Sequence, residues 1–129
     1  MTQEERSQRS RAQILDAALA LFSHQGYRAT SMREIAEKAG VSTGNVYHHF
    51  TDKEAIFLSL LDVYWQAIED PSFPVNRALT TGSFPENLED IGRAARESVA
   101  QYRPYVTLIY VDVVEFEVSH IRKFYSEMA

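Results

Sequence analysis

The chain has 129 residues, of which 45% are hydrophobic and 24% are charged, a composition typical of one or two small soluble domains. It has no cysteine, which excludes a disulfide framework and a metal site built on thiolates. The first ten residues are polar, unlike a signal peptide, and no apolar run reaches the roughly 18 residues of a membrane span. We therefore expect a cytoplasmic protein without a membrane partner.

The net charge of −5 is unevenly distributed along the chain. Residues 1–53 hold seven basic and six acidic residues, a net charge of +1. Residues 54–129 hold six basic and twelve acidic residues, a net charge of −6. Such asymmetry indicates two parts with different partners, so the acidic total does not exclude nucleic acid as a partner of the first part.

Two capped helices open the predicted fold. The first covers residues 9–25, and its apolar residues recur at the spacing of one helix face: Ile14, Ala18, Leu21 and Phe22. The second covers residues 32–39, and Ser31 and Glu34 before and within it have the spacing of a capping box. A glycine directly follows each helix, at the position where glycine commonly ends one.

Residues 42–50 predict a third, short helix with a polar outward side. Ser42 is placed to cap it, and its inward side is limited to Val46 and Phe50. The other side chains carry hydrogen-bonding groups: Thr43, Asn45, Tyr47, His48 and His49. No acidic residue occurs in residues 40–50.

Two short helices joined by a turn with a glycine are typical of a helix-turn-helix, whose second helix enters the DNA major groove. That helix needs an apolar anchor on one side and groups that reach base edges and phosphates on the other. Residues 42–50 meet both conditions, and Gly44 allows close backbone approach to a ligand. A solvated polar surface is the simpler interpretation of one such helix alone, so it is the order of the capped helices that favours DNA binding.

The fourth predicted helix, residues 52–69, begins with a second capping box formed by Thr51 and Glu54. Lys53 lies in its first turn, where the helix dipole favours an anion and disfavours a cation. A phosphate at that helix end would contact both free backbone N–H groups and the ammonium, so Lys53 is a candidate phosphate ligand. The alternative is a solvated lysine of no consequence.

Prolines and a glycine interrupt residues 71–85, which we interpret as a boundary. Residues 86–102 then predict a helix with these residues inward: Leu88, Ile91, Ala95, Val99 and Tyr102. Residues 104–116 are rich in β-branched residues and are compatible with a strand. Helical spacing favours a helix there, with these residues inward: Val106, Ile109, Val113 and Phe116.

Residues 11–61 resemble the DNA-binding domain of the TetR (tetracycline repressor) family of bacterial transcriptional regulators. The resemblance rests on "TSMREIAEKAGVSTGNVYHHFTDKEAIF" and on "ILDAALALFSHQGY" before it. It implies an all-α fold, with a three-helix helix-turn-helix domain and basic N-terminal arm in residues 1–51. Residues 52–129 would hold a connecting helix and part of a helical ligand-binding and dimerisation domain. The implied function is a sequence-specific DNA-binding transcriptional regulator, a repressor released by a small-molecule ligand.

The resemblance also implies which residues contact double-stranded DNA. Those expected against base edges are Thr43, Gly44, Tyr47 and His48, with Arg33 reaching a guanine in the same groove. Those expected at phosphates are Ser31, Asn45, His49 and Lys53. Ser42 belongs to the same candidate interface. A flexible arm would follow the DNA backbone with Arg6, Arg9 and Arg11.

The family normally continues with two further long helices that pair across a two-fold axis, and this sequence ends at "FYSEMA" before them. A palindromic operator needs a dimer, so we expect a homodimer where those helices are present and weak DNA binding from this chain alone. The aromatic residues of the second half would contact a small apolar effector or simply form core, and core is the simpler interpretation. We expect no cofactor.

Two other functions are alternatives, an enzyme and a helical protein-interaction module. Glu117 and His120 form a Glu-x-x-His pair, but a di-iron site needs a second such pair and two more glutamates, so we expect neither an enzyme nor a metal site. His48 and His49 point about 100° apart on a helix and cannot bind one metal. A helical protein-interaction module without DNA binding is the alternative, although it leaves the acid-free residues 40–50 unexplained.

Overall fold

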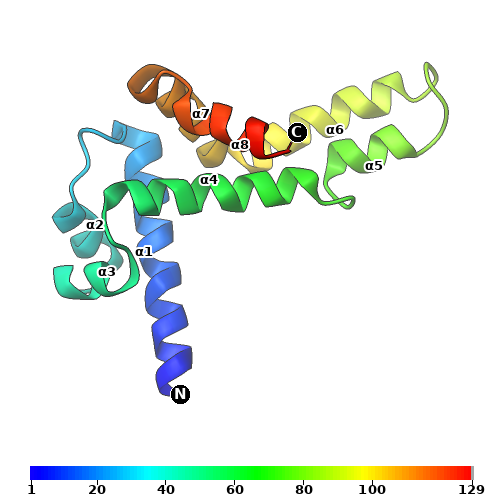
Figure 1. The fold of residues 1–129 in the computed structure, drawn as a ribbon. Helices are drawn as coiled ribbons and strands as arrows, with labels where there is room; N and C mark the ends of the chain where they lie inside the picture. Colours follow the sequence, from blue (N-terminus) through cyan, green and yellow to red (C-terminus); the bar gives the residue numbers. More distant parts are fainter. Residues whose placement is uncertain (129) are drawn as a thin grey trace.

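The computed structural model describes residues 1–128, and all regular structure within them is helical (Figure 1). In chain order the eight helices are α1 (Gln3–Gln25), α2 (Met32–Ala39), α3 (Thr43–His49), α4 (Lys53–Glu69), α5 (Pro74–Thr80), α6 (Leu88–Gln101), α7 (Arg103–Phe116) and α8 (Ser119–Met128). The expected all-α fold is therefore confirmed. It includes a helix at residues 104–116, whose β-branched residues were also compatible with a strand. Among the described helices, none combines the length and apolar character needed to cross a membrane.

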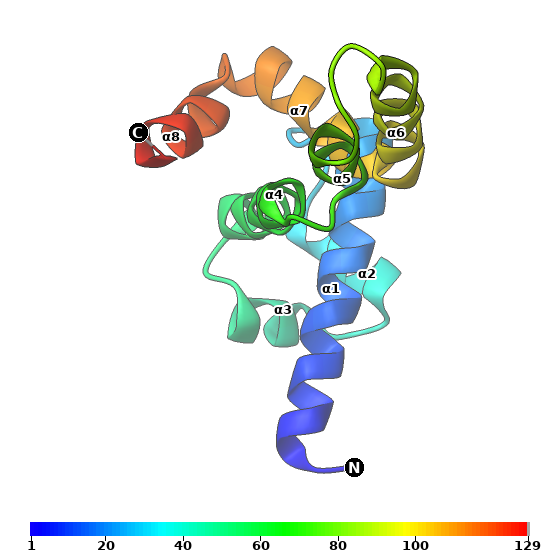
Figure 2. The same ribbon diagram turned by 90° about the vertical axis from the view of Figure 1, so that its right-hand side faces the viewer.

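The long helix α4 separates two parts of the molecule. α3 lies on one side of it and α7 and α8 lie on the other, while α5 and α6 form a hairpin at its far end (Figures 1 and 2). One hydrophobic core joins these parts, because residues of α1 to α4 and of α7 belong to the same buried cluster. Its largest fully buried members are Ile14, Phe22, Ile35, Val46, Ile56, Phe57, Leu60 and Leu108. We call α1, α2 and α3 together the head.

The caps of α2 and α3 form as the sequence predicts. Glu34 N donates to Ser31 Oγ at 3.0 Å, and Ser31 N donates to Glu34 Oε1 at 3.1 Å, so both halves of the capping box are present. Gly40 ends α2 with a φ of 75°, a left-handed conformation that disfavours other residues. Asn45 N donates to Ser42 Oγ at 3.0 Å, which caps α3. These contacts fix the turn between α2 and α3 and therefore the direction of α3.

The basic N-terminal arm is helical, contrary to the expectation of a flexible segment. α1 begins at Gln3, because Thr2 Oγ1 accepts the Glu5 backbone N–H at 3.1 Å and two acidic residues occupy the first turn. No glycine or proline interrupts the helix before Gly26, so Arg6 and Arg9 lie on continuous helix. The first turns of α1 project beyond α3 (Figures 1 and 2).

The predicted capping box at the start of α4 is wrong. Asp52 is the cap, with its Oδ1 accepting the Ala55 N–H at 2.8 Å. A carboxylate is favoured at this position by both the free N–H groups and the helix dipole, so Thr51 is not needed as a cap. Glu54 is then free to contact another element, His120 of α8.

The second half departs further from the predicted pattern. The expected boundary at residues 71–85 contains the short helix α5. α6 buries Ala94 and Ser98, while Leu88 and Val99 of the predicted inward stripe are 58% and 50% exposed. The side of α6 that is buried carries small residues, which let a neighbouring helix approach closely. The spacing of apolar residues predicts which side of a helix is apolar, but it does not predict which side another helix covers.

α7 also turns differently from the prediction. Its fully buried positions are Leu108 and Asp112, one turn apart, whereas Val113 is 46% exposed. The helix ends where Glu117 and Val118 adopt left-handed conformations, with φ of 53° and 61°. α8 starts directly afterwards, so the Glu-x-x-His pair does not share one helix face. We call residues 112–120 the α7–α8 corner.

Candidate nucleic-acid interface

The short helix α3 is held to the head by two apolar side chains. Val46 is fully buried and Phe50 is only 4% exposed, as the sequence predicts. The Arg11 guanidinium lies 5.0 Å from the centroid of the Phe50 ring, a cation–π contact between α1 and the end of α3. These contacts fix which side of α3 faces away from the molecule.

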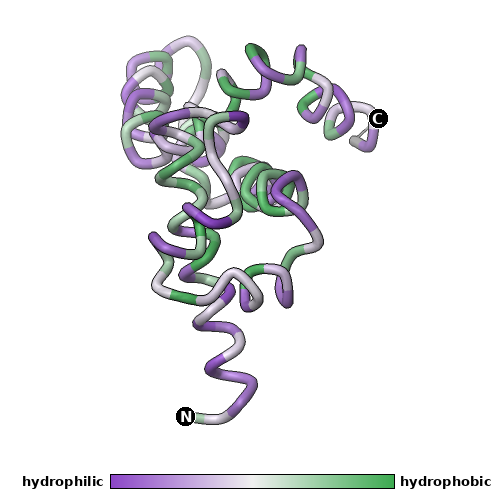
Figure 3. Tube along the Cα trace, turned by 90° about the vertical axis from the view of Figure 1, so that its left-hand side faces the viewer, coloured by the Kyte–Doolittle hydropathy of each residue, from purple (hydrophilic) through white to green (hydrophobic). Residues whose placement is uncertain are grey.

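That outward side carries the polar side chains expected there, and we call it the reading face. Thr43, Gly44 and His48 are exposed, and Tyr47 is 53% exposed although it is a large aromatic residue. Figure 3 shows the contrast, with hydrophobic residues gathered along α4 and mostly hydrophilic residues on the projecting turns of α1. Exposure is a condition for contact with DNA, and these residues meet it.

Asn45 has a structural contact as well as a place beside the reading face. It is partly buried, and its Oδ1 accepts a hydrogen bond from Ser10 Oγ of α1. This bond ties the first turn of α3 to α1. Replacing Asn45 would therefore disturb the position of α3 in addition to any phosphate contact.

His49 is partly buried next to two positive or ionisable neighbours. Burial lowers the pKa of His49, and the nearby His48 and Arg11 lower the same pKa further. The rings of His48 and His49 meet edge to face with centroids 5.1 Å apart. Within residues 1–128 no group of three or more His, Cys, Asp or Glu side chains is placed to hold a metal ion.

The two candidates on α2 differ in how freely they can move. Arg33 is exposed and pairs with Glu37 at 3.4 Å, one turn away, a surface pair of small energy that a base could displace. Ser31 is exposed, but its hydroxyl already caps α2. Ser42 has the same double position at the start of α3.

Lys53 folds back onto the loop between α1 and α2. Its Nζ donates to the Tyr27 carbonyl at 3.0 Å and lies 4.1 Å from the centroid of the Tyr27 ring. Burial lowers the pKa of Lys53, whereas the carboxylates of Glu115 and Glu34 act in the opposite direction. An ammonium has three hydrogens, so this position leaves two for another acceptor.

Sequence reasoning missed the side chain that holds this loop from the second half of the chain. The Glu115 carboxylate accepts the backbone N–H groups of Tyr27 at 2.7 Å and Arg28 at 2.8 Å. The Arg28 guanidinium donates to the Glu115 carbonyl at 2.7 Å. Asp112 and Glu115, three residues apart in a mostly apolar helix, were the available signal, because such carboxylates need partners.

The chain is similar in sequence to known bacterial transcriptional regulators. The profile described as "Bacterial regulatory proteins, tetR family" matches residues 14–60. The chain is 32% identical over 119 residues to the HTH-type transcriptional repressor KstR2 of Mycobacterium tuberculosis, which covers 91% of this chain and 57% of that protein. It is 45% identical over 60 residues to the HTH-type transcriptional regulator AcrR of Shigella flexneri, which covers 46% of this chain and 28% of that protein.

A solved structure agrees over almost the whole chain. The crystal structure of a TetR-family transcriptional regulator from Mesorhizobium loti matches with a TM-score of 0.67 at 30% identity, covering 98% of this chain and 62% of that one. These relatives carry the names of transcriptional regulators rather than of enzymes. The chain spans 28% of the length of AcrR and 57% of that of KstR2.

Proposed function

Because this chain belongs to the TetR family of bacterial regulatory proteins, we propose that it is a sequence-specific, DNA-binding transcriptional regulator. The observation that carries this proposal is the reading face of α3. Its polar side chains point away from the molecule while Val46 and Phe50 hold the helix to the core. A helix presented in this way fits the major groove of B-DNA.

The residues divide into those that read bases and those that position the protein. Thr43, Gly44, Tyr47 and His48 lie on the reading face, and with Arg33 they are assigned to base edges. Ser31, Ser42, Asn45, His49 and Lys53 are assigned to phosphates. Arg6 and Arg9, on the projecting turns of α1, add positive charge along the DNA backbone.

For the whole regulator, we propose a homodimeric repressor in the cytoplasm that a small-molecule effector releases from a palindromic operator. The name of KstR2, a transcriptional repressor, supports repression. A two-fold symmetric operator requires two heads at a fixed spacing, so an effector that favours another spacing lowers the affinity.

Selection of bound sites from random duplex DNA by the whole regulator, followed by binding measured at several salt concentrations, tests this function. We expect one enriched sequence and an affinity that falls steeply with salt, because phosphate contacts release counterions. Tyr47→Ala should weaken binding to that sequence by about 10- to 100-fold and relax selection at one base pair. Tyr110→Ala, which removes a tyrosine that is 68% exposed on α7, is the matched control and should leave affinity unchanged.

The opposite result would favour the alternative function. If no duplex is bound in a salt-dependent manner, or if Tyr47→Ala and Tyr110→Ala behave alike, the reading face is not a DNA-binding surface. A helical protein-interaction module would then be the better description.

A further inference from the structure

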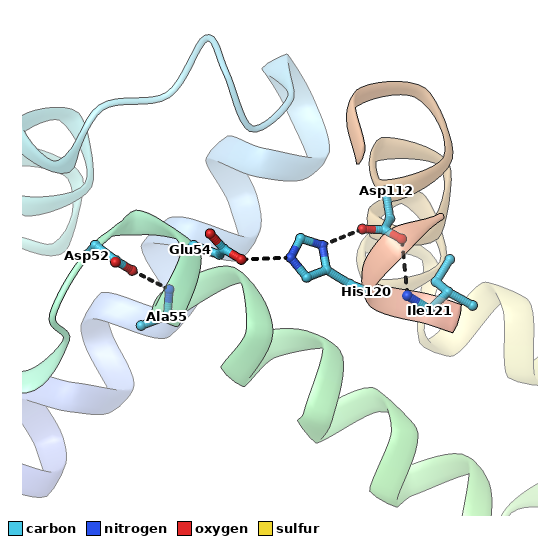
Figure 4. A network of polar contacts seen from close by, with 6 residues as sticks. All are labelled: Asp52, Glu54, Ala55, Asp112, His120 and Ile121. Atoms are coloured by element: carbon cyan, nitrogen blue, oxygen red, sulfur yellow. Dashed lines mark hydrogen bonds and ion pairs between the residues drawn. The ribbon is translucent and has the colours of Figure 1, made fainter. Parts of the chain in front are cut away.

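Three side chains from three helices form a polar chain beside the start of α4 (Figure 4). His120 Nδ1 lies 2.6 Å from Asp112 Oδ1, and His120 Nε2 lies 3.0 Å from Glu54 Oε1. Asp112 is fully buried, and its other oxygen accepts the Ile121 backbone N–H at 3.2 Å. His120 is only 7% exposed, whereas the Glu54 side chain is 53% exposed. Both nitrogens of one imidazole therefore face carboxylate oxygens.

The number of protons on the ring decides how many of these contacts are hydrogen bonds. A neutral imidazole has one N–H and donates to one carboxylate, while its other nitrogen turns a lone pair toward an anion. The doubly protonated ring donates to both. Asp112 cannot be hydrated where it lies, and a buried charge without a partner is costly, so a single proton stays on Nδ1. Glu54 reaches water, so its contact is the one that is lost.

We propose that His120 and Glu54 form a proton-dependent latch, which ties α8 to the first turn of α4 when the His120 ring carries two protons. Asp112 of α7 is the positioning residue that fixes the ring. Loss of one proton from the ring leaves His120 bound to Asp112 and opens the contact with α4. The latch is thus closed at lower pH and open at higher pH.

The surroundings of the ring are compatible with this change. The rings of Phe57 and Phe116 pack against it, with centroids at 5.6 Å and 4.5 Å. A cavity of about 310 Å³ between α4 and α8 lies on its other side. The charged groups that line this cavity are Asp62 of α4 and Lys123 and Glu127 of α8.

The latch contacts the first turn of α4, which directly follows α3 and its short link to α4. Glu54 belongs to the same first turn of α4 as Lys53, and Asp52 caps that turn. A closed latch therefore fixes α8 relative to the helix end that follows the reading face. The latch itself does not depend on DNA binding, but its effect on DNA affinity rests on the proposed function.

Titration of the histidine side chains by NMR, without DNA, tests the latch. Glu54→Gln removes the charge and keeps an oxygen that accepts a hydrogen bond, so the fold should survive. We expect the His120 titration to move to lower pH by about half a unit or more, because an opposite charge is lost from the ring. The titration of His24, which is exposed on α1, should not move. Identical His120 titrations in the two proteins would overturn the latch.

Glu69→Gln is the matched control, because it removes the same charge from the other end of α4. It should leave the His120 titration where it is. An equal displacement in Glu69→Gln and Glu54→Gln would mean that general charge, not the contact, governs the ring, and would also overturn the latch.

A second readout compares DNA affinity at pH 6 and pH 8. His48 and His49 of α3 contribute equally in the natural protein and in Glu54→Gln. Any difference between the two proteins in the pH dependence of affinity therefore comes from the latch. We expect the ratio of the two affinities to differ by threefold or more between these proteins. Equal ratios would overturn the link between the latch and α3. A displaced His120 titration without any DNA binding would keep the latch and overturn the proposed function instead.

Discussion

On α3 the polar side chains lie outside the molecule, and Tyr47 is 53% exposed, while at the α7–α8 corner Asp112 is fully buried and His120 is 7% exposed. Polar side chains are thus exposed on α3 and buried at the α7–α8 corner. Polar groups left in water remain available to an outside partner, whereas buried ones must be satisfied within the fold. Buried apolar side chains such as Val46 and Phe50 therefore stabilise the head, whereas hydrogen bonds of Asp112 and His120 fix the α7–α8 corner.

The largest expected effect is at the corner. Asp112→Ala should lower the free energy of unfolding by about 3–5 kcal/mol, because it leaves the His120 ring and the Ile121 N–H without their buried partner. Urea denaturation measures this change. Asp62→Ala, which removes an exposed carboxylate that bonds Gln66, should change it by less than about 0.5 kcal/mol. Equal changes in the free energy of unfolding would mean that the buried carboxylate at the corner contributes no more to stability than an exposed one.

At the head, stability should depend on the apolar anchor. Val46→Ala should cost about 2 kcal/mol of unfolding free energy, since a fully buried side chain loses two methyl groups and leaves a cavity. Val63→Ala on α4, where the valine is 44% exposed, should cost less than about 0.5 kcal/mol. The same denaturation assay compares them. A small effect of Val46→Ala would show that α3 is held by something other than its core contact.

Lys53 tests whether the start of α4 binds phosphate. Lys53→Ala should weaken binding to all DNA sequences alike and reduce the slope of log affinity against log salt by about one unit. Lys123→Ala, on α8, should leave that slope unchanged. Fluorescence anisotropy over a range of salt concentrations measures both. A slope that Lys53→Ala leaves unchanged would mean that the contact with Tyr27 is its whole role.

His49 should make DNA binding stronger as the pH falls. Burial lowers the pKa of His49 in the free protein, so the ring is neutral at pH 7. A phosphate placed beside it would favour the protonated ring, and binding would then take up a proton. Affinity should rise about twofold to threefold from pH 7.5 to pH 6. His49→Gln should remove this part of the rise and His24→Gln should not; the reverse would exclude the phosphate contact.

Of the expected effects on stability at these three positions, the smallest should come from the left-handed residue that ends α7. Glu117→Gly should raise the free energy of unfolding by up to about 1 kcal/mol, because glycine adopts a φ of 53° without steric cost. Glu97→Gly, inside α6, should lower it by about 1 kcal/mol. Thermal unfolding separates the two. A destabilising Glu117→Gly would mean that the side chain, not the backbone, sets this position.

The sequence predicts the head well because its signals are local. Ser31 with Glu34, Gly40 and Ser42 define helix ends within a few residues, and the structure places each cap as predicted. The polar side of α3 follows from the same spacing, since only Val46 and Phe50 can face inward. The DNA contacts themselves stay a prediction.

The corner escapes sequence reasoning because its partners are far apart in the chain. Nothing in the periodicity of α4 pairs Glu54 with His120, and the capping pattern assigns Glu54 to Thr51 instead. The predicted inward stripe of α6 is wrong for a related reason, because an apolar helix side does not show which other helix packs against it. Asp112 interrupts an apolar run, which indicates that this carboxylate needs a partner but does not identify which residue the partner is.

The unbroken helix α1 has a mechanical consequence. Its 23 residues make a rod about 34 Å long, which contacts α7 as well as α2, α3 and α4. A tilt of about 5° at the end near α7 would displace the far end by about 3 Å by leverage alone, for a rod of this length. Arg6 and Arg9 stand near that far end. Small rotations of the second half are thereby amplified into a shift comparable to the spacing of neighbouring base pairs.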